Sequence, residues 1–402
     1  MNCSPQQDAA LSAVARWLQS GEPQLFRMFG YAGTGKTTLA RHIAEAVDGD
    51  VAFAAFTGKA ALVLRNKGCV GAQTIHSLIY RSRGVDEESP TFVLNRESTA
   101  AKAKLIIIDE CSMVDEDLGR DLLSFGTPVL VLGDPAQLPP VKGGGFFTET
   151  EPDIMLTEVH RQAADNPIVR MSMIIREGGR LDVGEYGPSR VIRRSEVDPQ
   201  LVMSADQVLV GMNKTRRNYN ARMRQIMGRT ETVPVAGEKL VCLRNDKSKG
   251  LLNGGSWIVQ ELKTSKKGLV TMRVTPEDDP SGKPVKVSVL PNFFDGTEDE
   301  IPWELRKHTD EFTFGYALTV HKAQGSQWND IVLFDESFAF REHRARWLYT
   351  GLTRAAETIT VVVWGVGRGP FVFSLGVGSI PLRYGAGGLN GSDDCSRSHD
   401  LA

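Results

Sequence analysis

The sequence lacks the features of a membrane protein and of a disulfide-rich secreted protein. Its 402 residues contain no run of about 18 apolar residues, the length that a membrane-spanning helix needs. The amino terminus lacks the basic, apolar and small-residue succession of a secretion signal. Its five cysteines are scattered without CxxC or Cys/His spacing, which indicates reduced thiols rather than a zinc site or a disulfide framework. We therefore expect a soluble, cytoplasmic protein that makes no membrane contact.

A strong excess of charge of either sign is also missing. The chain has 47 basic and 49 acidic residues and a net charge of -2, which argues against a protein that coats nucleic acid through bulk charge. Any contact with nucleic acid must be local. With 41% hydrophobic residues, a chain of this length can form two or three packed domains.

A first α/β unit is predicted within residues 1–150. Short apolar runs at 25–29, 51–56, 105–108 and 129–132 have the length and content of buried parallel strands. Helix-like stretches separate these runs, and this alternation is typical of a doubly wound sheet. The helix expected over 37–47 has one apolar face, which consists of Leu39, Ala40, Ile43, Ala44 and Val47.

A second α/β unit is predicted over residues 151–234 and 311–364, with strands at 207–210, 316–320, 331–334 and 359–363. The segment between its two parts, 235–310, differs in kind because its apolar runs are short and β-rich and a turn of Asn253-Gly254-Gly255 follows the first of them. We expect a small β-barrel there. Residues 365–402 are Gly-rich and then polar, which predicts a partly disordered tail.

Residues 30–37 fit the pattern GxxxxGK[ST] between a predicted strand and a predicted helix. Its glycines allow backbone amides to turn toward phosphates at a helix amino terminus. Lys36 is expected to reach the β- and γ-phosphates of ATP, and Thr37 to ligate Mg²⁺. The other residues expected to bind nucleotide in this loop are Gly30, Ala32, Gly33, Thr34, Gly35 and Thr38.

Two further segments lie at the carboxyl ends of predicted strands, the edge where open α/β sheets bind ligands. Asp109 and Glu110 follow the run at 105–108. We expect Asp109 to hold Mg²⁺ and Glu110 to polarise the attacking water. Gln137 follows the next strand in residues 133–140 and is suited to sensing a γ-phosphate.

Residues 30–37, 105–110 and 133–140 resemble motifs I, II and III of superfamily 1 helicases of the RecD and Dda type, and the order continues along the chain. Residues 4–10 resemble the adenine-reading Q motif through Gln7. Residues 156–162 resemble motif IV through Arg161, 319–326 resemble motif V, and 349–355 resemble motif VI through Arg354. The resemblance implies two RecA-like P-loop NTPase domains with parallel sheets, an SH3-like β-barrel insertion and a short β-hairpin insertion at about 80–104.

The predicted arrangement of the two units gives Arg161 and Arg354 a physical role. Arg161 precedes the second unit and Arg354 lies within it, so an ATP held between the units would be clamped by charges from both. Motif V adds Gly325 and Gln327 to the nucleotide site. The family usually has a glutamate at the position of Gln327, and glutamine can donate and accept a hydrogen bond but cannot act as an anion.

The same resemblance implies contacts with DNA. Thr57 and Lys59 fall in a segment like motif Ia, Thr74 and His76 in a neighbouring motif, and Thr319 and His321 in motif V. Small hydroxyl residues and loop amides suit phosphate contacts, which position a strand without reading its bases. A packed histidine is the other interpretation of His76. Phe92 would be the wedge of the hairpin, although a buried hairpin phenylalanine is the competing interpretation.

The motifs together predict an ATP-dependent DNA helicase that moves 5′ to 3′ on single-stranded DNA and unwinds duplex, in replication, repair or recombination. A translocase or remodelling ATPase without strong unwinding is the alternative. A small-molecule kinase would leave motifs IV to VI unexplained, and a non-catalytic scaffold would be expected to have lost Lys36 or Glu110. We expect single-stranded and forked DNA as partners, with single-strand-binding or replication proteins, and a monomer from a bacterium or a phage-infected cell.

Overall fold

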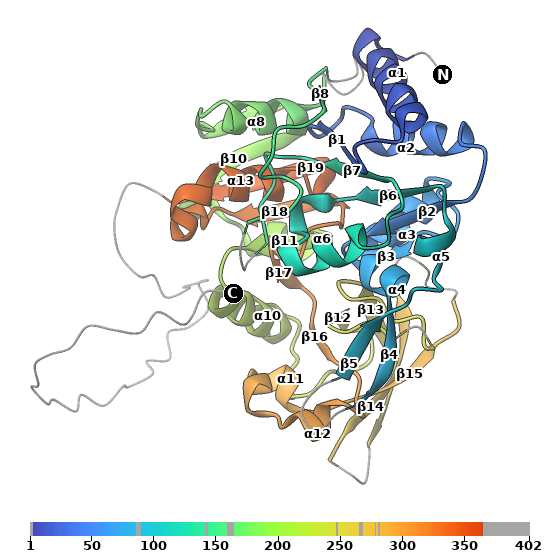
Figure 1. Ribbon diagram of the computed structural model, residues 1–402. Helices are drawn as coiled ribbons and strands as arrows, with labels where there is room; N and C mark the ends of the chain where they lie inside the picture. The colour runs from blue at the N-terminus through green and yellow to red at the C-terminus, as the bar shows by residue number, and fades with distance from the viewer. Residues whose placement is uncertain are drawn as a thin grey trace, which may run out of the picture.

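The computed structural model describes residues 3–85, 90–140, 144–158, 165–246, 248–264, 268–277, 279 and 282–364, and the side chains of 82–85, 90–92 and 264 also lie outside the description. Figure 1 shows two α/β units and a β-rich part at one end of the molecule. The predicted tail at 365–402 lies outside the described residues. No helix in the described part of the chain is long and apolar enough to cross a membrane.

The first unit is built on a parallel sheet. Among the described residues, six strands join in the order β3-β2-β6-β7-β1-β8, and every pairing is parallel. The runs predicted as strands all lie in this sheet, which confirms the α/β prediction. The bounds are β1 (Leu25–Gly30), β2 (Val51–Ala55), β3 (Gln73–Thr74), β6 (Leu105–Asp109), β7 (Val129–Gly133) and β8 (Ile154–Leu156).

Helices cover both faces of this sheet because its strands are apolar on both sides. Leu105 and Ile107 pack with helices α1, α2 and α3, whereas Ile106 and Ile108 pack with α4, α5 and α6. This alternation, with a period of two, places the core in two layers around one sheet. The bounds are α1 (Pro5–Ser20), α2 (Lys36–Glu45), α3 (Gly58–Asn66), α4 (Ile75–Ile79), α5 (Thr99–Lys102), η1 (Cys111–Met113) and α6 (Glu116–Leu123).

The second unit also has a mainly parallel sheet. Its described strands join in the order β17-β11-β18-β19-β10-β9, and only the edge strand β9 runs antiparallel to its neighbour. Its strands are β9 (Gly184–Tyr186), β10 (Ser189–Arg193), β11 (Gln207–Val210), β17 (Ala317–Thr319), β18 (Trp328–Phe334) and β19 (Ala355–Val363). Its helices are α8 (Pro167–Arg176), η2 (Arg194–Glu196), α9 (Pro199–Ser204), α10 (Asn213–Ile226), η4 (Ser337–His343) and α13 (Arg344–Leu352).

The predicted insertion forms a sheet of its own. Five strands of the described residues pair antiparallel in the order β15-β14-β13-β12-β16. The runs predicted to be β-rich are four of these strands. The bounds are β12 (Lys239–Cys242), β13 (Ser256–Thr264), β14 (Val270–Pro276), β15 (Val285–Val289) and β16 (Phe312–Phe314), with α11 (Asn292–Asp295), η3 (Glu298–Glu300) and α12 (Trp303–Arg306) between the last two.

Two of the predicted domain boundaries are wrong, each by one strand. Strand β8 was assigned to the second unit from 151 onward, but it pairs with β1 in the first sheet. Strand β16 was assigned to the second unit from 311 onward, but it pairs with β12 in the antiparallel sheet. Strands of three residues are too short to show a hydrophobic period, so the sequence did not reveal which sheet each one joins.

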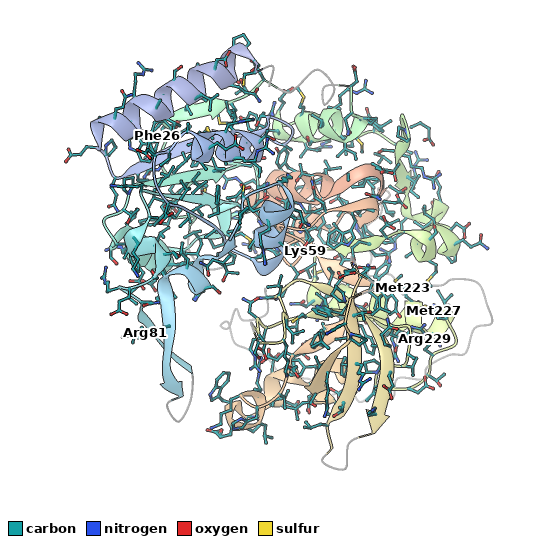
Figure 2. All side chains as sticks on the ribbon, turned by 90° about the vertical axis from the view of Figure 1, so that its right-hand side faces the viewer. Phe26, Lys59, Arg81, Met223, Met227 and Arg229 are labelled. Atoms are coloured by element: carbon teal, nitrogen blue, oxygen red, sulfur yellow. The ribbon has the colours of Figure 1, made fainter. Side chains whose placement is uncertain are left out.

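A β-hairpin projects from the first unit where the sequence predicted one. Strands β4 (Tyr80–Val85) and β5 (Pro90–Leu94) pair antiparallel, with an irregularity between Ser82 and Gly84. The hairpin and the five-stranded sheet extend toward the same end of the molecule in both views (Figure 1, Figure 2). The side chain of Phe92, the predicted wedge, lies outside the described residues.

Candidate active site

The Gly-rich loop joins the end of β1 to the start of α2, as the sequence predicts. Gly30 is the last residue of β1, and a Cβ atom there would lie 2.6 Å from Oγ1 of Thr34 and 2.8 Å from Cβ of Leu156. Gly35 precedes the helix with a φ of 82°, a conformation that costs glycine little. The loop therefore needs glycine at both ends, and it leaves Lys36 and Thr37 as the first two residues of the helix.

Lys36 is held over its own loop. Its Nζ donates hydrogen bonds to the carbonyl oxygens of Gly30, at 2.6 Å, and Tyr31, at 3.0 Å. Both acceptors are neutral, so the positive charge is directed at the loop without being neutralised by them. A charge in this position is suited to attract phosphate oxygens.

Thr37 and Asp109 meet across the gap between α2 and β6. Oγ1 of Thr37 donates to Oδ2 of Asp109 at 2.9 Å, and the amide of Glu110 donates to Oδ1 of Asp109 at 2.9 Å. A hydroxyl oxygen beside a carboxylate supplies the hard oxygen donors that Mg²⁺ prefers. The two residues predicted to hold magnesium are thus in contact, and their donor set fits that ion.

Glu110 lies next to this pair in a rare backbone conformation. Its φ of 54° and ψ of 46° are left-handed, which non-glycine residues adopt seldom and often at functional sites. Burial raises the pKa of the Glu110 carboxyl, the positive charge of Arg354 opposes this rise, and the negative charge of Asp109 adds to it. The carboxyl end of β6 therefore presents a strained, desolvated acid toward an arginine of the second unit.

Arg354 is the charge that the second unit brings to this site. The side chain is 4% exposed, and its three nitrogens donate to the carbonyl oxygens of Thr350 and Ser326 and to Oγ1 of Thr353 at 3.1 to 3.3 Å. All three acceptors are neutral. A buried guanidinium with neutral partners beside Glu110 keeps a charge that an anionic ligand can use.

The segment that follows β7, residues 134–138, forms hydrogen bonds with the second unit at both of its ends. Oδ2 of Asp134 accepts a hydrogen bond of 2.6 Å from the hydroxyl of Tyr349. At the other end, the amide of Leu138 donates to Oγ1 of Thr350 at 2.9 Å, and its carbonyl accepts from Nε2 of Gln324 at 3.1 Å. Gln137 lies between these ends, 7% exposed, and its Oε1 accepts no hydrogen bond from the described residues.

These contacts of the second unit were not predicted from the sequence. Tyr349, Thr350 and Gln324 stand inside the segments that resemble motifs V and VI, and Asp134 stands beside the strand end at Gly133. Their positions in those segments were visible, but a hydrogen bond between residues more than 180 apart has no signature in one sequence. The hydroxyl of Tyr349 also accepts from the amide of Ala32 in the Gly-rich loop at 3.0 Å.

Gln7 contacts the Gly-rich loop from helix α1 of the first unit. Its Nε2 donates to the carbonyl oxygen of Thr34 at 3.0 Å, and its Oε1 accepts from the amide of Ser4 at 3.1 Å as part of the cap of α1. The side chain is 2% exposed. The residue predicted to read adenine is thus anchored beside the loop that is predicted to bind phosphate.

The remaining predicted nucleotide residues differ in exposure and packing. Gly33 and Thr38 are exposed, and Gln327 is also exposed. Gly325 has a φ of 76°, and a Cβ atom there would lie 2.7 Å from Oγ1 of Thr57. Gly325 therefore packs against the first turn of α3. Arg161, the predicted arginine of motif IV, lies outside the described residues.

The predicted DNA contacts lie at strand ends of both units. Thr57 and Thr74 cap α3 and α4, and each accepts a hydrogen bond of 3.1 Å from an amide of its helix. His76 is exposed, with its ring centroid 5.0 Å from that of Tyr80. Figure 2 shows Lys59 on α3, near the second unit and the five-stranded sheet.

In the second unit, Thr319 ends β17 and His321 follows it. Oγ1 of Thr319 accepts from the amide of Lys322 at 3.3 Å, and Nζ of Lys322 lies 3.5 Å from Oδ1 of Asn253. Gly58 beside Lys59 approaches the same turn, because a Cβ atom there would lie 2.7 Å from Cβ of Leu252. Chain neighbours of the predicted contacts Lys59 and His321 therefore approach the turn between β12 and β13 from both units.

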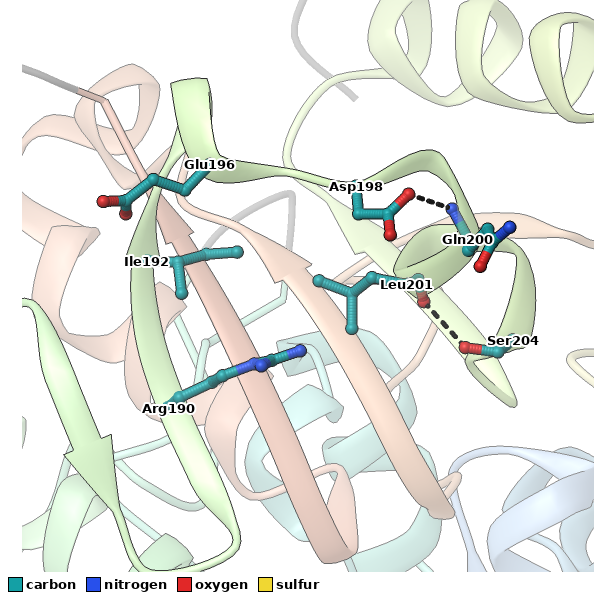
Figure 3. Close-up of a pocket in the computed structure, with 7 residues that line it drawn as sticks. All are labelled: Arg190, Ile192, Glu196, Asp198, Gln200, Leu201 and Ser204. Carbon is teal, nitrogen blue, oxygen red and sulfur yellow. Dashed lines mark hydrogen bonds between the residues drawn. The ribbon is translucent and has the colours of Figure 1, made fainter.

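A separate hollow lies away from these residues. It measures about 490 Å³ and is lined by seven residues of β10, η2 and α9, among them Arg190, Glu196 and Asp198 (Figure 3). None of these residues was predicted to bind nucleotide or DNA. The described residues also contain no group of three or more His, Cys, Asp or Glu side chains that could hold a metal ion without other ligands.

The chain is similar in sequence to known helicases. The chain matches the model of an AAA domain over residues 2–196 and that of a UvrD-like helicase C-terminal domain over 314–362. It is 29% identical to the ATP-dependent RecD2 DNA helicase of Deinococcus radiodurans over 83% of this chain and 46% of that protein. It is 35% identical to the ATP-dependent DNA helicase dda of Enterobacteria phage T4 over 37% of each chain.

A solved structure shares the fold. Bacteroides Pif1 bound to single-stranded DNA superposes with a TM-score of 0.53 and 19% identity, over 90% of this chain and 92% of that one. The chain spans less than half the length of the two curated relatives above.

Proposed function

The chain belongs to the superfamily 1 helicase family, and we propose from this premise that it is an ATP-driven motor that moves 5′ to 3′ on single-stranded DNA and unwinds duplex. It hydrolyses ATP bound with Mg²⁺ as its source of free energy. The observation that carries the proposal is the pair of hydrogen bonds by which Tyr349 of the second α/β unit reaches the predicted ATP site of the first, to Oδ2 of Asp134 at 2.6 Å and from the amide of Ala32 at 3.0 Å. Hydrolysis at such a site depends on how the two units are arranged.

Each residue of the site has a role in this proposal. Lys36 binds the β- and γ-phosphates, while Thr37 and Asp109 hold Mg²⁺, which neutralises charge on the phosphates. Glu110 orients and deprotonates the attacking water. Arg354 stabilises the charge of the transition state. Supporting roles in nucleotide binding belong to Gln7, Gln137, Arg161, Gly325 and Gln327.

Single-stranded DNA lies along the strand ends of both units in this account. Thr57, Lys59, Thr74 and His76 contact it from the first unit, and Thr319 and His321 from the second. Helix amino termini and hydroxyls contact phosphates without reading bases, which suits a motor that moves over any sequence. Because the net charge is only -2, the affinity has to arise from these local contacts.

Unwinding is favoured over translocation alone by the parts that project from the motor. We infer that the antiparallel sheet is an SH3-like barrel, because Val289 at the end of β15 bridges to Asp310, just before β16 at the other edge. The amide of Ser288 and Oδ2 of Asp310 add a hydrogen bond of 2.8 Å at this seam. The hairpin β4–β5 extends toward the same end of the molecule as this barrel (Figure 1, Figure 2) and would meet the fork.

The two α/β units are RecA-like domains in this proposal, and their relative movement produces the step. A strand gripped by both units is pulled when ATP closes the cleft and slides when it opens. We expect the motor to act as a monomer on forked DNA, alongside single-strand-binding or replication proteins, in replication, repair or recombination.

Stimulation of ATP turnover by DNA tests this proposal. The purified chain should hydrolyse MgATP slowly alone and faster by about tenfold or more with oligo(dT), because closure of the cleft completes the site. Duplex DNA without a tail serves as the control and should stimulate much less. A rate that does not respond to oligo(dT) would contradict the motor and favour a P-loop enzyme with a small-molecule substrate.

A further inference from the structure

Tyr349 joins the two α/β units at the Gly-rich loop. It lies on α13 of the second unit, 1% exposed, and its ring packs in the core of that unit. Its hydroxyl reaches two groups of the first unit, the amide of Ala32 at 3.0 Å and Oδ2 of Asp134 at 2.6 Å. One oxygen atom therefore connects the Gly-rich loop, the end of β7 and the second unit.

The direction of these hydrogen bonds is fixed. The amide of Ala32 can only donate, so the oxygen of Tyr349 accepts there and its own proton points to Asp134. Asp134 is 2% exposed, and its other oxygen, Oδ1, accepts from the amide of Ala136 at 3.0 Å. A carboxylate buried this deeply loses much free energy if a donor is removed, which makes the contact sensitive to the separation of the units.

Gln137 lies within the segment that this contact holds. Asp134 anchors one end of the segment through Tyr349, and Leu138 anchors the other through Thr350. Tyr349 and Thr350 are adjacent on α13, and Arg354, just beyond the end of this helix, donates to the carbonyl oxygen of Thr350 at 3.1 Å. Movement of this helix would therefore shift Gln137 and Arg354 together.

We propose that Tyr349 is a positioning residue whose hydroxyl ties the closing of the cleft to the Gly-rich loop and to Gln137. This inference rests on the proposed ATPase function. It assigns the coupling of the two units to one hydroxyl group, which acts through Asp134 and Ala32 rather than on the reacting atoms.

The variant Tyr349→Phe isolates this hydroxyl, because phenylalanine keeps the ring that packs in the core. The matched control is Tyr186→Phe in the same unit. The hydroxyl of Tyr186 also makes two hydrogen bonds, to the amide and the carbonyl of Asp182 at 3.0 and 3.1 Å, but far from the Gly-rich loop along the chain. A general effect of removing a tyrosine hydroxyl would appear in both variants.

Steady-state ATP turnover with saturating oligo(dT) is the first test. Tyr349→Phe should lower kcat by about 10- to 100-fold, the range expected for a lost hydrogen bond to a buried carboxylate. KM for ATP should stay within about threefold, because the loop still binds phosphate. Tyr186→Phe should match the parent. An unchanged kcat, or a raised KM with kcat preserved, would overturn the proposal.

A double-mutant cycle with Asp134→Asn tests whether Tyr349 acts through Asp134. If the two residues work as a unit, the double variant should turn over ATP about as slowly as the slower single variant. Losses that multiply would show that Tyr349 does not act through Asp134 and would overturn the inference.

Hydrogen exchange without nucleotide separates failure of the inference from failure of the proposed function. Tyr349→Phe should speed exchange in peptides covering 30–38 and 133–138, and Tyr186→Phe should not. If the parent hydrolysed no ATP, the proposed function would fail while this exchange difference still supported the contact. Equal exchange in the parent and Tyr349→Phe would overturn the inference whatever the ATPase result.

Discussion

The hydroxyl of Thr350 accepts a hydrogen bond of 2.9 Å from the amide of Leu138, although 212 residues separate the two. Leu138 belongs to the first α/β unit and Thr350 to the last helix of the second. Both groups are buried, so this bond can form only when the units are closed on each other. Arg354 lies four residues after Thr350 and donates to its carbonyl oxygen at 3.1 Å, and its positive charge opposes the rise in the pKa of the Glu110 carboxyl.

Replacement of Arg354 by lysine keeps a positive charge but removes the planar fork that binds two oxygens at once. We expect ATP turnover to fall by about 100-fold or more, since an arginine that stabilises the transition state is worth several orders of magnitude. Affinity for single-stranded DNA, measured by fluorescence anisotropy, should change far less. Arg346→Lys, an exposed residue of the preceding helix α13, is the control. Equal losses of turnover and affinity would instead indicate a role in folding or DNA contact.

Replacement of Lys36 by alanine should lower ATP turnover by orders of magnitude, because the charge that neutralises the phosphates is lost. The fold should persist, since the hydrogen bonds of Lys36 within the described residues go to carbonyl oxygens of its own loop. The exposed Lys102 provides the matched variant Lys102→Ala. Circular dichroism checks the fold, and turnover within tenfold of the parent would contradict the assignment.

Gly325 and Gly71 form a matched pair for testing the contact between the units. Both have a φ of 76°, but a Cβ atom at Gly325 would lie 2.7 Å from Oγ1 of Thr57 and 3.0 Å from Cβ of Ala60, whereas at Gly71 nothing lies within 4 Å. Gly71→Ala should cost about 1 kcal/mol from backbone strain alone.

Gly325→Ala should cost more than Gly71→Ala by about 1 to 3 kcal/mol, and it should weaken the stimulation of ATP turnover by oligo(dT). Urea unfolding and ATP turnover measure the two effects. Equal stability of the two variants would mean that Gly325 does not pack against α3 in solution.

The buried carboxyl of Asp134 should make the stability of the folded protein depend on pH. Burial raises the pKa of its carboxyl above the ordinary value of 3.8, although Lys36 and the hydrogen bond from Tyr349 oppose the rise. The folded chain therefore holds this proton at a higher pH than the unfolded chain, and its contribution to stability falls as pH rises from about 4 through the raised pKa.

Asn cannot ionise, so the variant Asp134→Asn lacks this fall. Its urea midpoint, taken relative to that of the parent, should rise between pH 4 and pH 7. Taking the difference between the midpoints of the variant and the parent removes the effect of the other titrating groups, because both proteins contain them. A midpoint difference that does not change over this range would show that the pKa of Asp134 is not raised by folding.

The sequence predicted the sheets well because buried strands carry a strong local signal. The runs at 105–108 and 207–210 are continuous and apolar, and they form β6 and β11 with nearly the expected bounds. Thr37 and Asp109 were each predicted to hold Mg²⁺, and the structure brings their side chains into contact. Roles of these residues in catalysis stay predictions until they are measured.

The contacts between the units could not be predicted in the same way. The hydrogen bond from Tyr349 to Asp134 depends on how two domains dock, and each residue alone has an ordinary local pattern. The predicted sheet assignment of the three-residue strands β8 and β16 was wrong for a related reason. The sheet that each one joins is decided by the strand with which it pairs and not by its own residues. Tertiary contacts decide these positions, and one sequence does not display them.

Strand displacement on tailed duplexes tests the central claim most directly. The substrates share one duplex and carry a 5′ tail only, a 3′ tail only or no tail, and Lys36→Ala is the inactive control. With MgATP the chain should displace the strand from the 5′-tailed duplex and not from the 3′-tailed or blunt one. Displacement from the 3′-tailed duplex alone would contradict the proposed direction, and ATP turnover without displacement from any substrate would contradict unwinding and favour a translocase.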